Sequence, residues 1–98
     1  MATPPKIAGI PWYQNADYPR ILQIMEDAHL LPAKHKIWQE KAEKAEALHK
    51  AQGVTIYRAH IDPEQFVAWC AQTGRNIDAK ARIDWANLYA MRKFRGEN

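Results

Sequence analysis

One cysteine, Cys70, is the only thiol in the chain, so no intramolecular disulfide can form. Such sparing use of cysteine is typical of proteins from a reducing compartment. No run of the sequence approaches the ~20 apolar residues of a membrane-spanning helix. The first six residues, Met-Ala-Thr-Pro-Pro-Lys, lack the apolar stretch of a secretory signal. We therefore expect a cytoplasmic protein with no membrane partner.

Signatures of catalysis and of cofactor binding are equally scarce. The four glycines are isolated, so none of them belongs to a phosphate-binding loop. The four histidines lack the paired spacing with which two ligands converge on one zinc ion. Cys70 follows Phe66 by four residues in an apolar helical pattern, which predicts a core residue and not a nucleophile. The sequence thus predicts a protein that is not an enzyme and has no metal or cofactor.

The size and charge of the chain limit its function further. Its 98 residues, 47% of them hydrophobic, are typical of one soluble domain, which we expect to span residues 1–98 with a loose tail at 1–6. A domain this small has little room for a deep cofactor cavity. The net charge of +3 comes from 14 basic and 11 acidic residues, without the dense basic patch of a dedicated nucleic-acid-binding protein.

The first half of the chain has the apolar spacing of two helices. Asp17 can cap the first helix, which Leu30-Leu31-Pro32 ends. Four apolar residues share one face of it: Ile21, Leu22, Met25 and Ala28. A second helix is expected from about residue 33 to residue 52, where Gly53 ends it. Its narrow apolar stripe consists of Ile37, Trp38, Ala42, Ala45 and Leu48.

The second half predicts two more helices. Asp62-Pro63-Glu64-Gln65 is typical of a helix start, with Asp62 as the N-cap, and Gly74 ends this third helix. Asn76 or Asp78 can cap the fourth helix. Its apolar stripe consists of Ile77, Ala81, Trp85, Leu88 and Met91. We expect Trp69 and Cys70 of the third helix and Trp85 of the fourth to be buried between the two helices.

Residues 53–61 form the one convincing strand. Its main-chain groups must be hydrogen-bonded, so it needs a partner. One candidate is the segment 7–13 of the same chain, in which Pro11 removes a donor. The other is the same strand of a second molecule, in which case the chain is a homodimer, and this is our prediction. The strand residues that would pair are Val54, Thr55, Ile56, Tyr57, Arg58, Ala59, His60 and Ile61. The fold class is α+β, with four helices and one or two short strands in the order (β)-α-α-β-α-α.

Strand, capped helix, glycine-containing turn and second helix follow one another across residues 53–94, and this pattern resembles the ribbon-helix-helix fold. In that family two chains pair their strands into an antiparallel ribbon that enters the DNA major groove, and the second helix begins against phosphate. The resemblance implies that Thr55, Tyr57, Ala59 and Ile61 face the core and that Ile56, Arg58 and His60 face outward. The nucleic-acid contacts that it implies are Arg58, His60, Arg75 and Asn76.

Four other stretches look similar to short, uncharacterised bacterial proteins: Ile-Pro-Trp-Tyr at 10–13, Asp-Tyr-Pro-Arg at 17–20, Ile-Met-Glu-Asp at 24–27 and Ile-Asp-Pro-Glu-Gln-Phe-Val-Ala-Trp-Cys at 61–70. That resemblance implies no function. The sequence therefore predicts a small non-catalytic binding or protein-interaction domain, whose partner is a second copy of itself or another protein. The alternative is a DNA-binding regulator of ribbon-helix-helix type, and the third candidate is a small enzyme or an accessory subunit of one.

Overall fold

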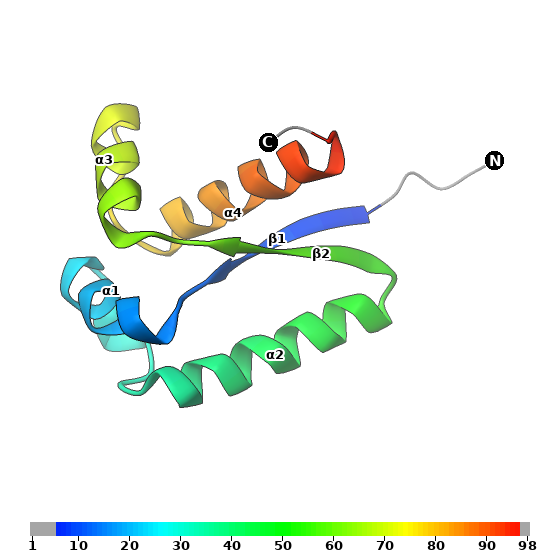
Figure 1. The fold of residues 1–98 in the computed structure, drawn as a ribbon, viewed down its shortest axis with the longest axis horizontal. Helices are drawn as coiled ribbons and strands as arrows, with labels where there is room; N and C mark the ends of the chain where they lie inside the picture. The colour runs from blue at the N-terminus through cyan, green and yellow to red at the C-terminus, as the bar shows by residue number, and fades with distance from the viewer. Residues whose placement is uncertain (1–5, 97–98) are drawn as a thin grey trace.

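The computed structural model describes residues 6–96 (Figure 1). Strands β1 (Lys6–Trp12) and β2 (Val54–His60) form a two-stranded parallel sheet. Helices α1 (Tyr18–Ile24) and α2 (His35–Ala51) connect the strands, and α3 (Pro63–Thr73) and α4 (Ala79–Phe94) follow β2. Short 3-10 turns, η1 (Asn15–Asp17) and η2 (Ala28–Leu30), flank α1. This architecture confirms the predicted α+β class and the order of the elements.

Lys6, which was expected to belong to a loose N-terminal tail, is the first residue of β1. Residues 1–5 of that tail lie outside the described part of the chain. None of the helices described between residues 6 and 96 is long and apolar enough to cross a membrane.

The partner of β2 is β1. Gly9 lies opposite Tyr57 and Trp12 lies opposite His60, and the N–H of Ile61 donates to the carbonyl oxygen of Trp12 at 2.9 Å. Pro11 does not weaken this ladder, because alternate residues of a strand direct their main-chain groups to opposite sides and those of residue 11 point away from β2. On this edge, β2 therefore pairs with a strand of its own chain and not with a second molecule.

Two helices cover opposite sides of the strand pair (Figure 1). Helix α4 packs against β1 and β2, whereas α2 packs against β2. The close approach of α4 depends on Gly9, since a Cβ atom there would overlap the main chain of Ala86. Lys6 is exposed, and the other residues of β1 are half-buried.

The core lies between the sheet, α1 and α3. Its largest fully buried side chains are Phe66, Ile21, Ile61 and Cys70. The burial of Cys70 confirms its prediction as a core residue. Trp69 and Trp85 meet edge to face with ring centroids 5.3 Å apart, but both are only half-buried, so they border the core and do not fill it.

The predicted ends of the last two helices are correct. The carboxylate of Asp62 accepts the N–H of Gln65 at 2.9 Å, and the carboxylate of Asp78 accepts the N–H of Ala81 at 3.1 Å. Gly74 ends α3 with a left-handed φ of 69°. Asp17 stands at the N-cap position of α1 as predicted, but its side chain makes no capping hydrogen bond to the helix.

Two predicted apolar stripes need correction. Ile37 and Leu48 of α2 are 42% and 60% exposed, and Leu88 and Met91 of α4 are 38% and 46% exposed. The buried residues are Trp38, Ala42 and Glu46 in α2, and Ala81, Arg82, Ala86 and Ala90 in α4. Helix α2 touches the sheet with a narrow side on which Glu46 meets Arg58 of β2. Helix α4 turns Ala86 toward Gly9 of β1, because small side chains permit a close approach of the two main chains.

Candidate functional site

The outer edge of β2, which we define as the side of Val54, Ile56, Arg58 and His60, faces away from β1. Since the N–H of Ile61 is directed to β1, the main-chain groups of alternate residues in β2 are directed to the opposite side. The carbonyl oxygen of His60 accepts a hydrogen bond from Nε1 of Trp85 at 3.2 Å. Within residues 6–96, the main-chain groups of Ile56 and Arg58 have no hydrogen-bond partner. This edge therefore keeps free donors and acceptors.

The outer edge of β1 differs in this respect. The N–H of Gly9 donates to Oδ1 of Asn87 in α4 at 3.2 Å. Pro11, two residues further along the same edge, has no N–H. Such devices prevent an exposed edge from pairing with another strand. The sheet thus has one blocked edge and one open edge.

Arg58 is engaged by its own chain. Its Nε lies 2.7 Å from Oε2 of Glu46 and its Nη2 lies 2.8 Å from Oε1, while its Cζ lies 3.9 Å from the centroid of the Trp12 ring. The hydrogen bond from Arg58 lowers the pKa of Glu46 below its ordinary value. His60, also on the outer edge of β2, has Nε2 at 3.3 Å from Oδ2 of Asp17.

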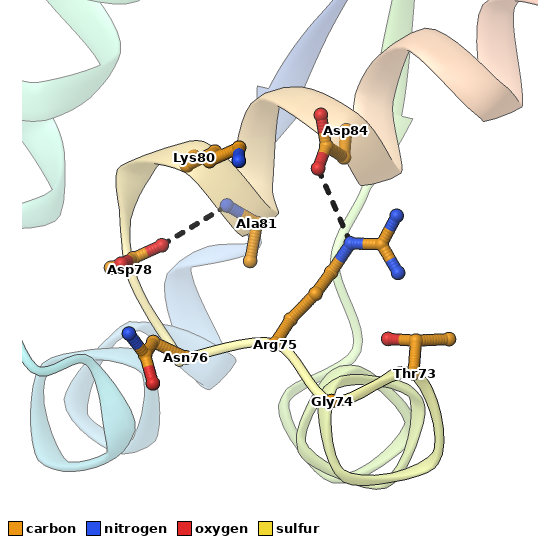
Figure 2. Close-up of a pocket in the computed structure, with 8 residues that line it drawn as sticks. All are labelled: Thr73, Gly74, Arg75, Asn76, Asp78, Lys80, Ala81 and Asp84. Atoms are coloured by element: carbon orange, nitrogen blue, oxygen red, sulfur yellow. Dashed lines mark hydrogen bonds and ion pairs between the residues drawn. The ribbon is translucent and has the colours of Figure 1, made fainter.

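The turn between α3 and α4 borders a polar pocket of about 340 Å³ (Figure 2). Figure 2 shows that Arg75 extends toward Asp84, whereas Asn76 points away from Asp84. Nε of Arg75 lies 3.2 Å from Oδ2 of Asp84, and its Cζ lies 4.4 Å from the centroid of the Trp69 ring. The pocket contains Lys80 as well as Arg75, but Asp78 and Asp84 balance these two cations.

The residues implied as nucleic-acid contacts therefore do not form a free cationic surface. Arg58 and His60 lie on β2, whereas Arg75 and Asn76 lie at the turn between α3 and α4. Each of the three basic side chains has a carboxylate partner within the chain.

A second hollow of about 340 Å³ lies beside β1, and we call it the β1 groove. Its residues come from β1, from the segment after it, and from both flanking helices. They are Ile10, Pro11, Tyr13, Leu31, Trp38, Lys41, Ala42, Ala79, Arg82 and Ile83. Most of them are apolar, and the only charged ones are Lys41 and Arg82.

Arg82 is the central polar group of the β1 groove. It is only 8% exposed, and its Nη1 and Nη2 lie 2.7 and 3.0 Å from the two carboxylate oxygens of Asp27. Nη1 also lies 3.4 Å from Sδ of Met25. The hydrogen bond from Arg82 lowers the pKa of Asp27. Asp27 is not among the residues that line the groove, so it binds the guanidinium from outside the lining.

Aromatic contacts hold Tyr13 and Trp38 in place at the β1 groove. Their ring centroids are 4.6 Å apart, and Nε2 of His35 lies 2.7 Å from the carbonyl oxygen of Tyr13. The neighbouring Tyr18 donates its hydroxyl to the carbonyl oxygen of Pro32 at 2.6 Å. Burial raises the pKa of Tyr13 to about 12, so its hydroxyl is neutral at physiological pH. The groove is therefore preformed and carries no negative charge of its own.

Comparison with protein-family models, with curated proteins and with solved structures gives no match. The function is therefore inferred from the geometry of the chain alone. Sequence reasoning missed Tyr13, Asp27 and Arg82 as a group. The sequence did contain one signal for the burial of Arg82. Arg82, Ala86 and Ala90 recur every four residues and so share one face of α4.

Proposed function

We propose that this protein is a small, non-catalytic interaction domain of the cytoplasm that forms a homodimer through the outer edge of β2. The observation that supports this proposal is the pair of unpartnered main-chain groups at Ile56 and Arg58. A strand edge with free N–H and C=O groups is a template for another strand. Two copies related by a two-fold axis can pair their β2 strands in antiparallel fashion, because a two-fold interface presents the same surface from each subunit.

The contrast between the two edges also supports this choice. The outer edge of β1 is blocked by Asn87 and Pro11, whereas no residue of the described chain hydrogen-bonds Ile56 or Arg58 on the outer edge of β2. Helices α2 and α4 stabilise the two-stranded sheet by packing against it, but they do not hydrogen-bond the main-chain groups of Ile56 or Arg58 on the outer edge of β2. Pairing of β2 with a second β2 extends the sheet to four strands.

Proline substitutions distinguish the two edges of β2. Ile56→Pro deletes an N–H that faces away from β1, so we expect it to abolish the dimer and to leave the sheet within the chain intact. Tyr57→Pro is the matched control, because its N–H is directed to β1 and its loss weakens the monomer itself. Sedimentation velocity at tens of micromolar measures the assembly, and urea unfolding measures the stability.

The unaltered protein should sediment as a dimer. A clean 11.3 kDa monomer at these concentrations contradicts the proposal. So does an Ile56→Pro variant that remains folded and fully dimeric, because the interface then lies elsewhere. Asn87→Ala provides a further control, since it frees the N–H of Gly9 on the other edge and should leave the β2 dimer unchanged.

A further inference from the structure

The β1 groove has the size and composition of a site for a small molecule. Its volume of about 340 Å³ lies at the lower end of the range of about 300 to 1,000 Å³ that is usual for ligand pockets. Its walls are mainly apolar, with Trp38 on α2 and Ile83 on α4, and polar groups are few. Ile83 is 54% exposed although it lies on the wall of a hollow.

The charges that line the groove are of one sign. Arg82 and Lys41 line it, and no aspartate or glutamate does. Because Asp27 balances the charge of Arg82 from outside the lining, the net positive charge at the groove is that of Lys41. The bonds of Arg82 to Asp27 and Met25 use three of the five N–H donors of a guanidinium. Tyr13 adds no negative charge at physiological pH. A ligand that matches this groove therefore combines an apolar body with one anionic group.

The edge of β1 excludes an extended peptide as the occupant. Peptides bind beside a strand chiefly through main-chain hydrogen bonds. Here the N–H of Gly9 is already bound to Asn87 and Pro11 has no N–H. The groove can thus receive an apolar group, but it cannot add a strand.

We propose that the β1 groove binds a small aromatic carboxylate, with the ring against Trp38 and Ile83 and the carboxylate at Arg82 and Lys41. Nη1 and Nη2 of Arg82 already bind Asp27, so the ligand carboxylate would accept from Nε and from the second N–H of Nη2, and would pair with the exposed ammonium of Lys41. The contacts of Trp38 with Tyr13 and His35 hold the apolar wall in place before any ligand arrives, which reduces the entropy lost on binding.

The probes are 2-naphthoate and its uncharged analogue 2-naphthylmethanol, added to the full-length protein labelled with nitrogen-15. Naphthoate should shift the signals of Trp38, Lys41 and Ile83 in a saturable manner below ~1 mM, a modest affinity for a shallow site. The alcohol should bind more weakly, by up to about fivefold, as expected for the loss of a partly exposed ion pair. Lys41→Gln should weaken naphthoate binding and leave the binding of the alcohol unchanged.

A matched pair of variants on α4 tests the location. Ile83→Glu places a carboxylate in the wall of the groove and should weaken naphthoate binding by about tenfold or more, which corresponds to ~1.4 kcal/mol. Leu88→Glu makes the same change at a residue that is 38% exposed and does not line the groove, and it should have no effect. The proposal is overturned if naphthoate does not bind saturably or if its shifts map outside the groove. It is also overturned if the acid and the alcohol bind equally, or if Ile83→Glu and Leu88→Glu have equal effects.

The test is independent of the dimer. The β1 groove lies on the side of β1, whereas the proposed interface lies on the outer edge of β2. The Ile56→Pro variant should therefore bind naphthoate as the unaltered protein does. A monomeric variant that has lost this binding contradicts the assignment of the site to a single chain.

Discussion

Gly9 of β1 lies against the main chain of Ala86 in α4, so closely that a Cβ atom on residue 9 would overlap the carbonyl oxygen of Ala86. The next residue of the helix, Asn87, accepts the N–H of Gly9. Ala86 and Asn87 belong to one turn of α4. Ala86 therefore sets the distance between α4 and β1, and Asn87 sets the position of α4 along β1. The same contact sets the wall of the β1 groove, because Ile83 precedes Ala86 by three residues on α4.

Gly9→Ala should destabilise the protein by roughly 2 to 3 kcal/mol, since main chain cannot move aside as a flexible side chain does. In a strand without such a contact, replacement of glycine by alanine is normally favourable. Gly53→Ala is the control: it has a φ of 83° but no atom within 4 Å of the added Cβ, so it should cost only about 1 kcal/mol. Urea unfolding measures both variants. A Gly9→Ala protein as stable as the unaltered one contradicts the proposed docking of α4.

The sequence allowed the last two helices to be placed because their ends are set by local chemistry. Asp62, Gly74 and Asp78 act through hydrogen bonds and dihedral angles within a few residues, and such signals are visible in one sequence. The partner of β2 was harder to predict, since β1 is more than forty residues away in the chain and no local signal links them. The register of β1 on β2 shows that the missing N–H of Pro11 removes no hydrogen bond between the two strands, and the sequence does not contain this register.

The exposed faces of α2 and α4 could not be predicted from apolar spacing. Trp38 and Ala42 lie where expected, but Glu46 takes the next buried position because it pairs with Arg58 on β2. A charged residue in a buried position depends on a partner that is distant in sequence, as Arg82 depends on Asp27. Since the candidate groove is built around such a pair and around Ile83, which lies in no predicted apolar stripe, apolar spacing did not predict it.

Asp27→Asn should lower the free energy of unfolding at neutral pH by roughly 2 kcal/mol, because it removes the charge from two charge-assisted hydrogen bonds to the nearly buried guanidinium of Arg82. The pKa of Asp27 is lowered in the folded protein, chiefly by the hydrogen bond from Arg82. Its contribution to stability is therefore present above the unfolded pKa of about 4 and is lost as the pH falls through the folded pKa.

Urea unfolding from pH 7 to pH 2 measures this linkage. The difference in stability between the unaltered protein and Asp27→Asn should shrink as the pH falls below about 4. Glu64→Gln is the control, because Glu64 pairs with Arg20 at the surface and should contribute little. A difference that stays constant over the whole range contradicts the assignment of the stabilising charge to Asp27.

Cys70 should react slowly with thiol reagents in the native state, since it is 1% exposed and burial raises the pKa of its thiol. Trp85→Ala should speed this reaction and destabilise the protein by about 3 kcal/mol, because Trp85 packs against Phe66 and Trp69 beside the core. Trp85→Phe keeps one six-membered aromatic ring but loses the pyrrole part of the indole and the hydrogen bond to His60, so it should cost about 1 to 2 kcal/mol. A labelling time course with and without urea provides the comparison. Rapid labelling of the native protein contradicts the core position of Cys70.

Binding of this protein to DNA should be weak and nonspecific, because its candidate base-reading residues are engaged within the chain. Arg58 directs two nitrogen atoms to Glu46 and stacks on Trp12, so a phosphate or a base must compete with both contacts. Arg58→Ala should therefore reduce stability, by leaving the buried Glu46 without its cation, and should not change the affinity for mixed duplexes. Lys44→Ala, which removes an exposed cation from the same helix as Glu46, is the control for loss of charge alone. Titration at physiological salt is the measurement, and saturable sub-micromolar binding that Arg58→Ala abolishes would instead favour the ribbon-helix-helix type of regulator.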